Sequence, residues 1–229
     1  MRKVSGLVVT LLFFISPCFA QINARSAPGH VIVKFSPLTL FDIDNTVQFG
    51  VEIPLGHEKL TLQQDLGYGH SSFSIWYSGY DYRPDKEIFK TRTQLRYYYF
   101  GKKWARGYVG PEFMFKKVIY RENKFVGMDC VNGTCGYFEN KDIKSARSVG
   151  AAHVKAGWQF YFSNRMTLDV FTGFGLRQYR VRSLSDGVDD FNFSGSGYFW
   201  ENNRPGSIET FPSLAMGFNI GIMLGKFED

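Results

Sequence analysis

The chain has 229 residues and a formal net charge of +6, and 17% of its residues are aromatic. The mild, evenly spread charge argues against nucleic acid as a partner, and no segment approaches the roughly eighteen uninterrupted apolar residues of a membrane-spanning helix. Many aromatic residues and 24 glycines beside a mean hydropathy of −0.20 are typical of a membrane β-barrel, whose strands alternate lipid-facing apolar residues with a polar lumen.

Residues 1–20 have the pattern of a secretory signal peptide. Arg2 and Lys3 precede a short apolar run over residues 7–15, and small residues then predict cleavage before Gln21. Removal of this segment takes away two basic residues and no acidic ones, so the net charge falls from +6 to +4.

A lipidated Cys18 is the alternative interpretation of the N-terminus. Pro17 disfavours it, because a small residue is expected at that position. After cleavage we expect a short N-terminal segment over residues 21–28 and a single β-barrel domain over residues 29–229.

Eight segments of the mature chain alternate apolar and polar residues. Side chains in a strand point to opposite faces in turn, so this alternation predicts strands with one apolar face. Pro111, inside the fifth segment, predicts a β-bulge. In chain order the segments lie at about 29–37, 46–55, 59–69, 88–100, 107–120, 147–162, 168–177 and 213–224.

The lengths of the connecting segments alternate as well. The connectors after the second, fourth and sixth strands are short and lie at 56–58, 101–106 and 163–165. Those after the third, fifth and seventh strands are long and lie at 70–87, 121–146 and 182–210. Outer-membrane barrels have short periplasmic turns and long external loops, so the alternation predicts an eight-stranded antiparallel up-and-down transmembrane barrel. The short connector Asp42–Asn45 would also be external.

The polar face of the strands carries eight charged residues, which we expect to form a lumenal charge network. A basic side chain facing lipid would cost about 2–4 kcal/mol at the bilayer midplane, so the apolar face is expected to face outward. Eight strands enclose an interior about as wide as the side chains that fill it, which favours a packed network over a conducting channel. The eight residues are Glu52, Asp65, Arg92, Arg96, Glu112, Lys155, Asp169 and Arg177.

Cys130 and Cys135 enclose Asn132-Gly133, a pair that favours a tight turn. Two nearby cysteines in an exported protein are normally oxidised, so we predict a disulfide in the third long loop. The sequence indicates neither a metal site nor a cofactor.

The stretch from Lys34-Phe35-Ser36-Pro37 to Asn45-Thr46-Val47-Gln48 resembles the start of small outer-membrane β-barrel proteins of Bacteroidetes, which are similar in outline to the OmpA and OmpX transmembrane barrels. The alternation Phe218, Ile220, Ile222 and Leu224 resembles a barrel assembly signal, although Glu228 and Asp229 follow Phe227. The resemblance implies a location in the outer membrane and partners among membrane lipids and the barrel assembly machinery; it implies no reaction.

His70 and Ser72, with Glu87 across a loop, are the catalytic candidates of an alternative hypothesis. They resemble the His-x-Ser and Glu arrangement of a lipid A deacylase, which implies an outer-leaflet, lipid-modifying enzyme. Our leading hypothesis is instead a non-enzymatic outer-membrane barrel with a structural or surface-interaction role, whose external loops contact a surface ligand. A third hypothesis is a soluble exported barrel that binds a small ligand.

Overall fold

The computed structural model describes residues 30–42, 44–56, 59–73, 85–102, 104–131, 134–162, 165–185, 188 and 205–225. The predicted signal peptide, with Cys18, and the segment 21–28 lie outside these residues. So do large parts of the predicted loops 70–87 and 182–210.

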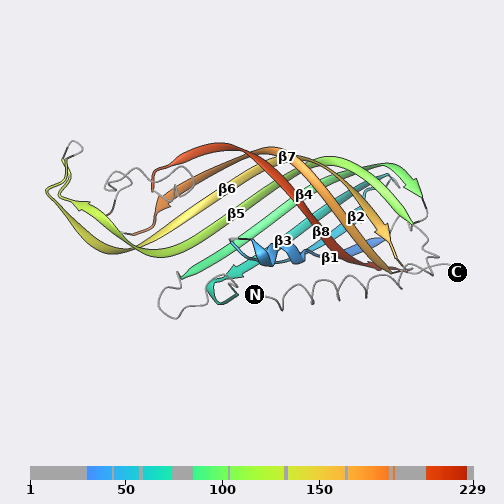
Figure 1. Cartoon of the computed structure of the whole chain (residues 1–229), viewed down its shortest axis with the longest axis horizontal. Coiled ribbons are helices and arrows are strands. Elements are labelled where there is room, and N and C mark those ends of the chain that lie inside the picture. The colour runs from blue at the N-terminus through green and yellow to red at the C-terminus, as the bar shows by residue number, and fades with distance from the viewer. Residues whose placement is uncertain are drawn as a thin grey trace, which may run out of the picture.

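Eight β-strands form one antiparallel sheet that closes on itself (Figure 1). Each strand pairs with its neighbours in the chain, and β1 also pairs with β8, so the order around the ring follows the sequence. The predicted all-β, eight-stranded, up-and-down architecture is thereby confirmed. In chain order the elements are β1 (Val31–Phe35), η2 (Pro37–Phe41), β2 (Val47–Pro54), β3 (Leu60–His70), η3 (Ser71–Phe73), β4 (Lys86–Lys102), β5 (Ala105–Met128), β6 (Tyr137–Tyr161), β7 (Met166–Ser183) and β8 (Ile208–Leu224).

The 3-10 helix η2 follows β1 where the sequence predicts more strand. Pro37 stands at the start of η2, where its fixed backbone angle and missing N–H are tolerated, so β1 ends before it. The connector between β1 and β2 is therefore longer than the expected turn Asp42–Asn45. The Thr39 hydroxyl lies within hydrogen-bond distance of the carbonyl oxygens of Ser36 (2.7 Å) and Thr46 (2.8 Å), which links η2 to the start of β2. Within the described residues, no helix is both long and apolar enough to cross a bilayer.

Burial alternates along the strands and separates an outer face from an inner face. Val154 is 64% exposed, whereas its chain neighbour Lys155 is 2% exposed. Because adjacent side chains point to opposite faces, the two lie on opposite sides of the sheet. Lys34 on β1 contacts Asp169 on β7 at 3.1 Å, and these strands are not neighbours in the ring. Such contacts place the polar face inside the barrel and the apolar face outside it.

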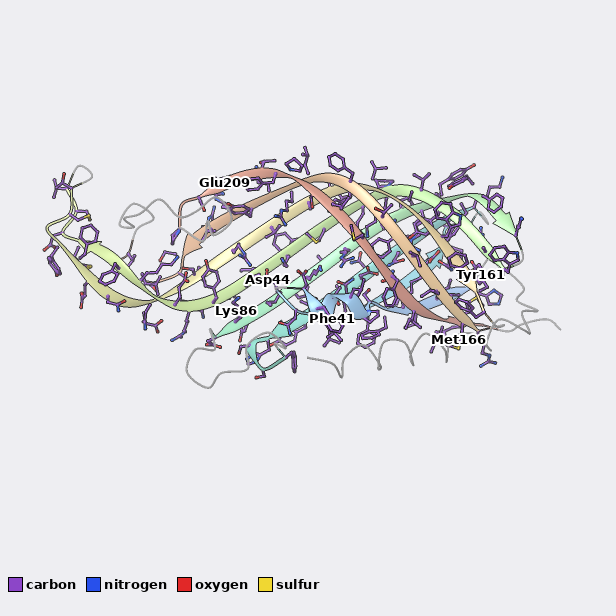
Figure 2. The ribbon with its side chains drawn as sticks, in the orientation of Figure 1. Phe41, Asp44, Lys86, Tyr161, Met166 and Glu209 are labelled. Carbon is purple, nitrogen blue, oxygen red and sulfur yellow. A yellow bond between two sulfur atoms is a disulfide. The ribbon has the colours of Figure 1, made fainter. Side chains whose placement is uncertain are left out.

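The strand connections are short at one end of the barrel and longer at the other, as predicted (Figure 1). Figure 2 shows Tyr161 and Met166, on either side of the β6–β7 turn, at the end that we call the turn end. Glu209, at the start of β8, lies toward the opposite end, which we call the loop end.

The strands β5 and β6 extend much further than the alternation predicts. Their pairing continues from Tyr120 opposite Ser145 to Met128 opposite Tyr137. The pairing of β6 with β7 ends at Ser145, so residues 121–128 and 137–144 form a two-stranded ribbon, which we call the projecting hairpin (Figure 1). The prediction of a loop over 121–146 is therefore wrong, and the connector spans only 129–136.

Two features explain why pairing persists in the projecting hairpin. Cys130 and Cys135 form a disulfide that closes its tip, which confirms the predicted bond. Val126 and Ile143, from the two strands, also form a buried apolar cluster with Val188 from the β7–β8 connection. The ribbon thus has a small hydrophobic cluster of its own beyond the ring.

Pro111 lies within β5 without the predicted bulge. The register between β4 and β5 is the same on both sides of it, with Gln94 opposite Glu112 and Tyr97 opposite Val109. Proline removes one ladder donor but requires no extra residue, so the register can continue. The register shift lies nearer the turn end, between Tyr98 and Phe100 of β4.

Candidate functional site

Four charged side chains meet inside the barrel, and we call them the central network: Lys34, Glu52, Arg96 and Asp169. Lys34 Nζ lies 2.5 Å from Glu52 and 3.1 Å from Asp169. The Arg96 guanidinium lies 3.3 Å from Glu52 and 2.8 Å from Asp169. Each cation therefore contacts both carboxylates, and all four side chains are at most 2% exposed. This mutual pairing offsets part of the high cost of burying charge.

Neutral side chains bind the remaining polar atoms of the central network. The Tyr98 hydroxyl donates to Glu52 at 2.6 Å, and the Tyr108 hydroxyl donates to Asp169 at 2.7 Å. The Arg96 guanidinium also lies over the Tyr108 ring, 4.1 Å from its centroid. Charge-assisted bonds of this kind are stronger than neutral ones and hold both partners in one geometry.

A second ion-pair cluster lies on β5 and β6. Lys155 donates to Glu112 in a short, buried ion pair. His153 Nδ1 lies 3.6 Å from Glu112, and His153 Nε2 is 3.0 Å from the Ser213 hydroxyl of β8. His153 therefore connects the Glu112–Lys155 ion pair to β8, the last strand of the ring.

Asp65 is bound by amides rather than by a cation. The side chains of Gln48 and Gln63 donate to it at 3.1 Å and 2.7 Å. Arg92 is its register partner on β4, yet within the described residues no ion pair of 4.0 Å or less joins the two. The Nε–H of the half-buried Arg92 donates to no acceptor among those residues.

A third ion cluster lies where the β1–β2 connector meets β5 and β6 and involves Asp44, which Figure 2 labels. Its carboxylate is 2.8 Å from Lys116 and 2.6 Å from Arg147. Burial raises the pKa of Asp44, but the two cations outweigh burial, so the pKa falls from an ordinary 3.8 to about 2. Asp44 is therefore ionised across the physiological range.

The residues predicted for the lumenal network occupy three environments. Six are at most 4% exposed, Arg92 is half-buried, and Arg177 is exposed opposite Phe211 of β8. The sequence analysis did not include Lys34 in the lumenal network. Its position between Val33 and Phe35, on the polar face of its strand, could have indicated it. The six buried members are Glu52, Asp65, Arg96, Glu112, Lys155 and Asp169.

The catalytic candidates lie on the outer face, near the loop end of β3 and β4. His70 Nδ1 is 3.0 Å from the Ser72 hydroxyl, and it also accepts a bond from the Ser72 backbone N–H at 3.2 Å. Glu87 is the register partner of His70, so both project from the same face. The contacts within the described residues include no bond between their side chains. The structure thus brings together a His–Ser pair with a carboxylate on the adjoining strand.

An open apolar groove of about 440 Å³ lies on the same part of the outer face. Phe73 and Phe89, which line it, are three residues from His70 and two from Glu87 in the chain. The groove is lined almost wholly by apolar atoms and offers almost no polar group to a ligand. Its other lining residues are Val47, Phe49, Leu66, Gly67 and Tyr68.

Comparison with known proteins identifies a family. A family model described as a protein of unknown function (DUF3575) matches residues 9–189. The chain belongs to the DUF3575 family. In this DUF3575 protein the matched region includes β1 to β7, and with them the whole central network. No curated protein and no solved structure matches the chain.

The wider resemblance is supported only in part. This DUF3575 protein has the all-β, eight-stranded antiparallel architecture that the sequence predicts. Its resemblance to outer-membrane barrels of the OmpA and OmpX type stays a prediction. Among the described residues no three His, Cys, Asp or Glu side chains are grouped so that they could hold a metal ion.

Proposed function

We propose that this DUF3575 protein is a non-enzymatic β-barrel of a bacterial outer membrane, with a rigid packed interior and a projecting hairpin that contacts ligands at the cell surface. The observation that carries the proposal is the apolar outer face, because soluble proteins rarely expose continuous apolar patches of more than a few hundred Å². Large apolar side chains between 36% and 66% exposed occur on all eight strands. They include Val33, Phe49, Val51, Leu66, Leu95, Phe113, Phe115, Val154, Val170, Phe174, Leu214, Met216 and Ile222.

The height of this outer face fits a bilayer. On β5 the outward positions from Ala105 to Phe115 carry no charge, and Lys117 is the first that does. On β7 the outward positions from Met166 to Gln178 are likewise uncharged, and Arg180 follows. Ten residues at about 3.3 Å each, tilted by about 40°, rise about 25 Å, which is the height of the apolar band of such barrels.

The interior supports a closed barrel rather than a channel or a soluble carrier. A soluble ligand-binding barrel needs apolar side chains around its cavity and polar ones outside, which is the reverse of this arrangement. The central network spans the ring from β1 and β2 to β4 and β7. Eight strands leave little room beside such side chains, so we expect no conducting path.

Membrane fractionation with heat-dependent gel mobility tests the location. We expect the protein in the outer-membrane fraction, running faster before boiling than after it. A protein recovered free in the periplasm would overturn the proposal.

Cysteine labelling tests the orientation. In a Cys130→Ser, Cys135→Ser background, Phe138→Cys on the projecting hairpin should react with a membrane-impermeant maleimide on intact cells. Lys59→Cys, at the turn end, should react only after lysis. Labelling of both positions on intact cells would contradict the orientation.

A second candidate function, lipid ester hydrolysis, is favoured by the His70–Ser72 contact beside the apolar groove. In this reaction the Ser72 hydroxyl oxygen attacks the ester carbonyl while His70 Nδ1 accepts its proton. The alcohol leaves with that proton, and water then releases the fatty acid from Ser72. The groove would hold the acyl chain.

Lipid mass spectrometry of cells that carry and lack the gene tests this second candidate. Ser72→Ala should abolish any change in acylation, and Ser71→Ala, its neighbour in η3, should not. An unchanged lipid profile, or equal effects of the two substitutions, would remove the enzymatic candidate.

A further inference from the structure

The outer face carries a row of polar side chains on β5, β6 and β7 at the loop end. Lys117 is the register partner of Ser148, and Ser148 is the register partner of Arg180. Lys117 and Arg180 are exposed, Ser148 is half-buried, and all three have the outward parity of their strands. The row therefore presents two cations with a hydroxyl between them. We call it the basic row.

Among the residues that the structure describes, neither cation of the basic row pairs with a carboxylate. Within the described residues, no ion pair of 4.0 Å or less involves Lys117 or Arg180. On the described strands, the nearest outward-facing acid is Glu87, which pairs with Ile119, two residues from Lys117 along β5. Arg182, the next outward residue of β7, adds a further exposed positive charge.

The row stands at the edge of the apolar face. Phe115, the next outward residue toward the turn end on β5, is 44% exposed, and Phe113 beyond it is 64% exposed. Leu176, on β7, is 57% exposed. Ala152 of β6 is the register partner of both Leu176 and Phe113, so these three residues lie in one row across the sheet. A ligand that fits this surface has a hydrocarbon part beside a negatively charged head.

Adjacent strands are about 4.8 Å apart, so the Cα atoms of Lys117 and Arg180 are about 10 Å apart. Long lysine and arginine side chains can both reach one group placed above Ser148. Arginine and lysine donors suit phosphate oxygens, and a serine hydroxyl supplies a further donor.

We propose that Lys117, Ser148 and Arg180 form a binding site for the phosphate head of an anionic lipid, whose acyl chains lie against Phe113, Phe115 and Leu176. This inference rests on the proposed membrane location. It adds lipid selectivity, because basic side chains at a membrane surface favour anionic over zwitterionic lipids.

Lipid retention measures the selectivity. The full chain is reconstituted into phosphatidylcholine vesicles with and without phosphatidylglycerol, extracted in mild detergent, and analysed by native mass spectrometry for bound lipids. We expect preferential retention of phosphatidylglycerol by the wild type. Each basic side chain contributes a factor of about five, so Lys117→Gln with Arg180→Gln should weaken the preference roughly 25-fold. Lys117→Arg with Arg180→Lys should keep it.

Lys124→Gln with Lys141→Gln is the matched control. These two lysines are register partners on the projecting hairpin, so the control removes the same charge away from the basic row. An equal loss in the control, or equal retention by the wild type and the Lys117/Arg180 variant, would overturn the site. Heat-dependent gel mobility checks that each variant is folded. Failure of the wild type to insert into either vesicle would instead refute the membrane location, on which the site depends.

Discussion

Arg96 of β4 and Asp169 of β7 are joined across the barrel interior by an ion pair of 2.8 Å. Both side chains are at most 1% exposed, and the strands that carry them are separated by two others in the ring. The pair therefore links opposite walls of the barrel, which backbone pairing alone cannot do.

Asp169→Asn should destabilise the barrel by about 3–5 kcal/mol, because it leaves Lys34 and Arg96 sharing one buried carboxylate. Unfolding in urea, followed by tryptophan fluorescence, measures the change. Asp142→Asn is the control. Asp142 is 58% exposed and 3.8 Å from Arg121, so its loss should cost less than about 1 kcal/mol. Similar losses in the two variants would show that the central network does not stabilise the fold.

Val154→Arg should destabilise the barrel by about 2–4 kcal/mol if the outer face meets lipid. In water the same change at a 64% exposed position should stay within about 0.5 kcal/mol. Val131→Arg, at a 71% exposed position on the tip of the projecting hairpin, should have little effect in either case. Unfolding in lipid vesicles measures both variants, and a neutral Val154→Arg would speak against burial in the bilayer.

Asp44 should make the barrel less stable in acid. Its folded pKa of about 2 lies below the ordinary 3.8, so its contribution is complete above pH 4 and disappears as the pH falls to about 2. The shift corresponds to about 2 kcal/mol. The unfolding free energies of the wild type and Asp44→Asn should therefore differ at pH 7 and converge toward pH 2. A constant difference over this range would contradict the role of the Lys116 and Arg147 pairs.

Cys130→Ser with Cys135→Ser should loosen the hairpin tip and leave the ring intact. The bond closes a short loop beyond the ring, so its removal should not change the global free energy of unfolding by more than about 1 kcal/mol. Hydrogen exchange should accelerate in residues 121–128 and 137–144 but not in the paired region Ala151–Tyr161. Faster exchange throughout the barrel would show that the disulfide supports the whole fold.

The strand architecture could be predicted because apolar residues at every second position indicate directly which side chains share a face of a strand. Val154 and Lys155 lie on opposite faces as their parity requires. The contacts inside the barrel could not be predicted in the same way. The meeting of Arg96 with Asp169 depends on the tilt and stagger of the closed sheet, which no local pattern reports.

The length of the projecting hairpin could not be predicted from the sequence for a different reason. Arg121, Glu122 and Lys124 interrupt the apolar alternation, because residues beyond the ring do not separate a polar interior from an apolar outer face. Only the register through Met128 opposite Tyr137 shows that pairing continues. The His70–Ser72 contact, in contrast, could be predicted from the sequence, because it joins residues only two positions apart.

The five-residue strand β1 also constrains the order of assembly. It pairs with Ile220–Leu224, so closure of the ring joins residues as distant in the chain as Val31 and Leu224. Local hairpins such as β5–β6 can form early, whereas this contact carries a high entropic cost and depends on the last strand of the chain. Until that strand arrives, the growing sheet has two free edges, which are templates for pairing with other chains. A newly made chain therefore needs protection from aggregation until its first and last strands meet.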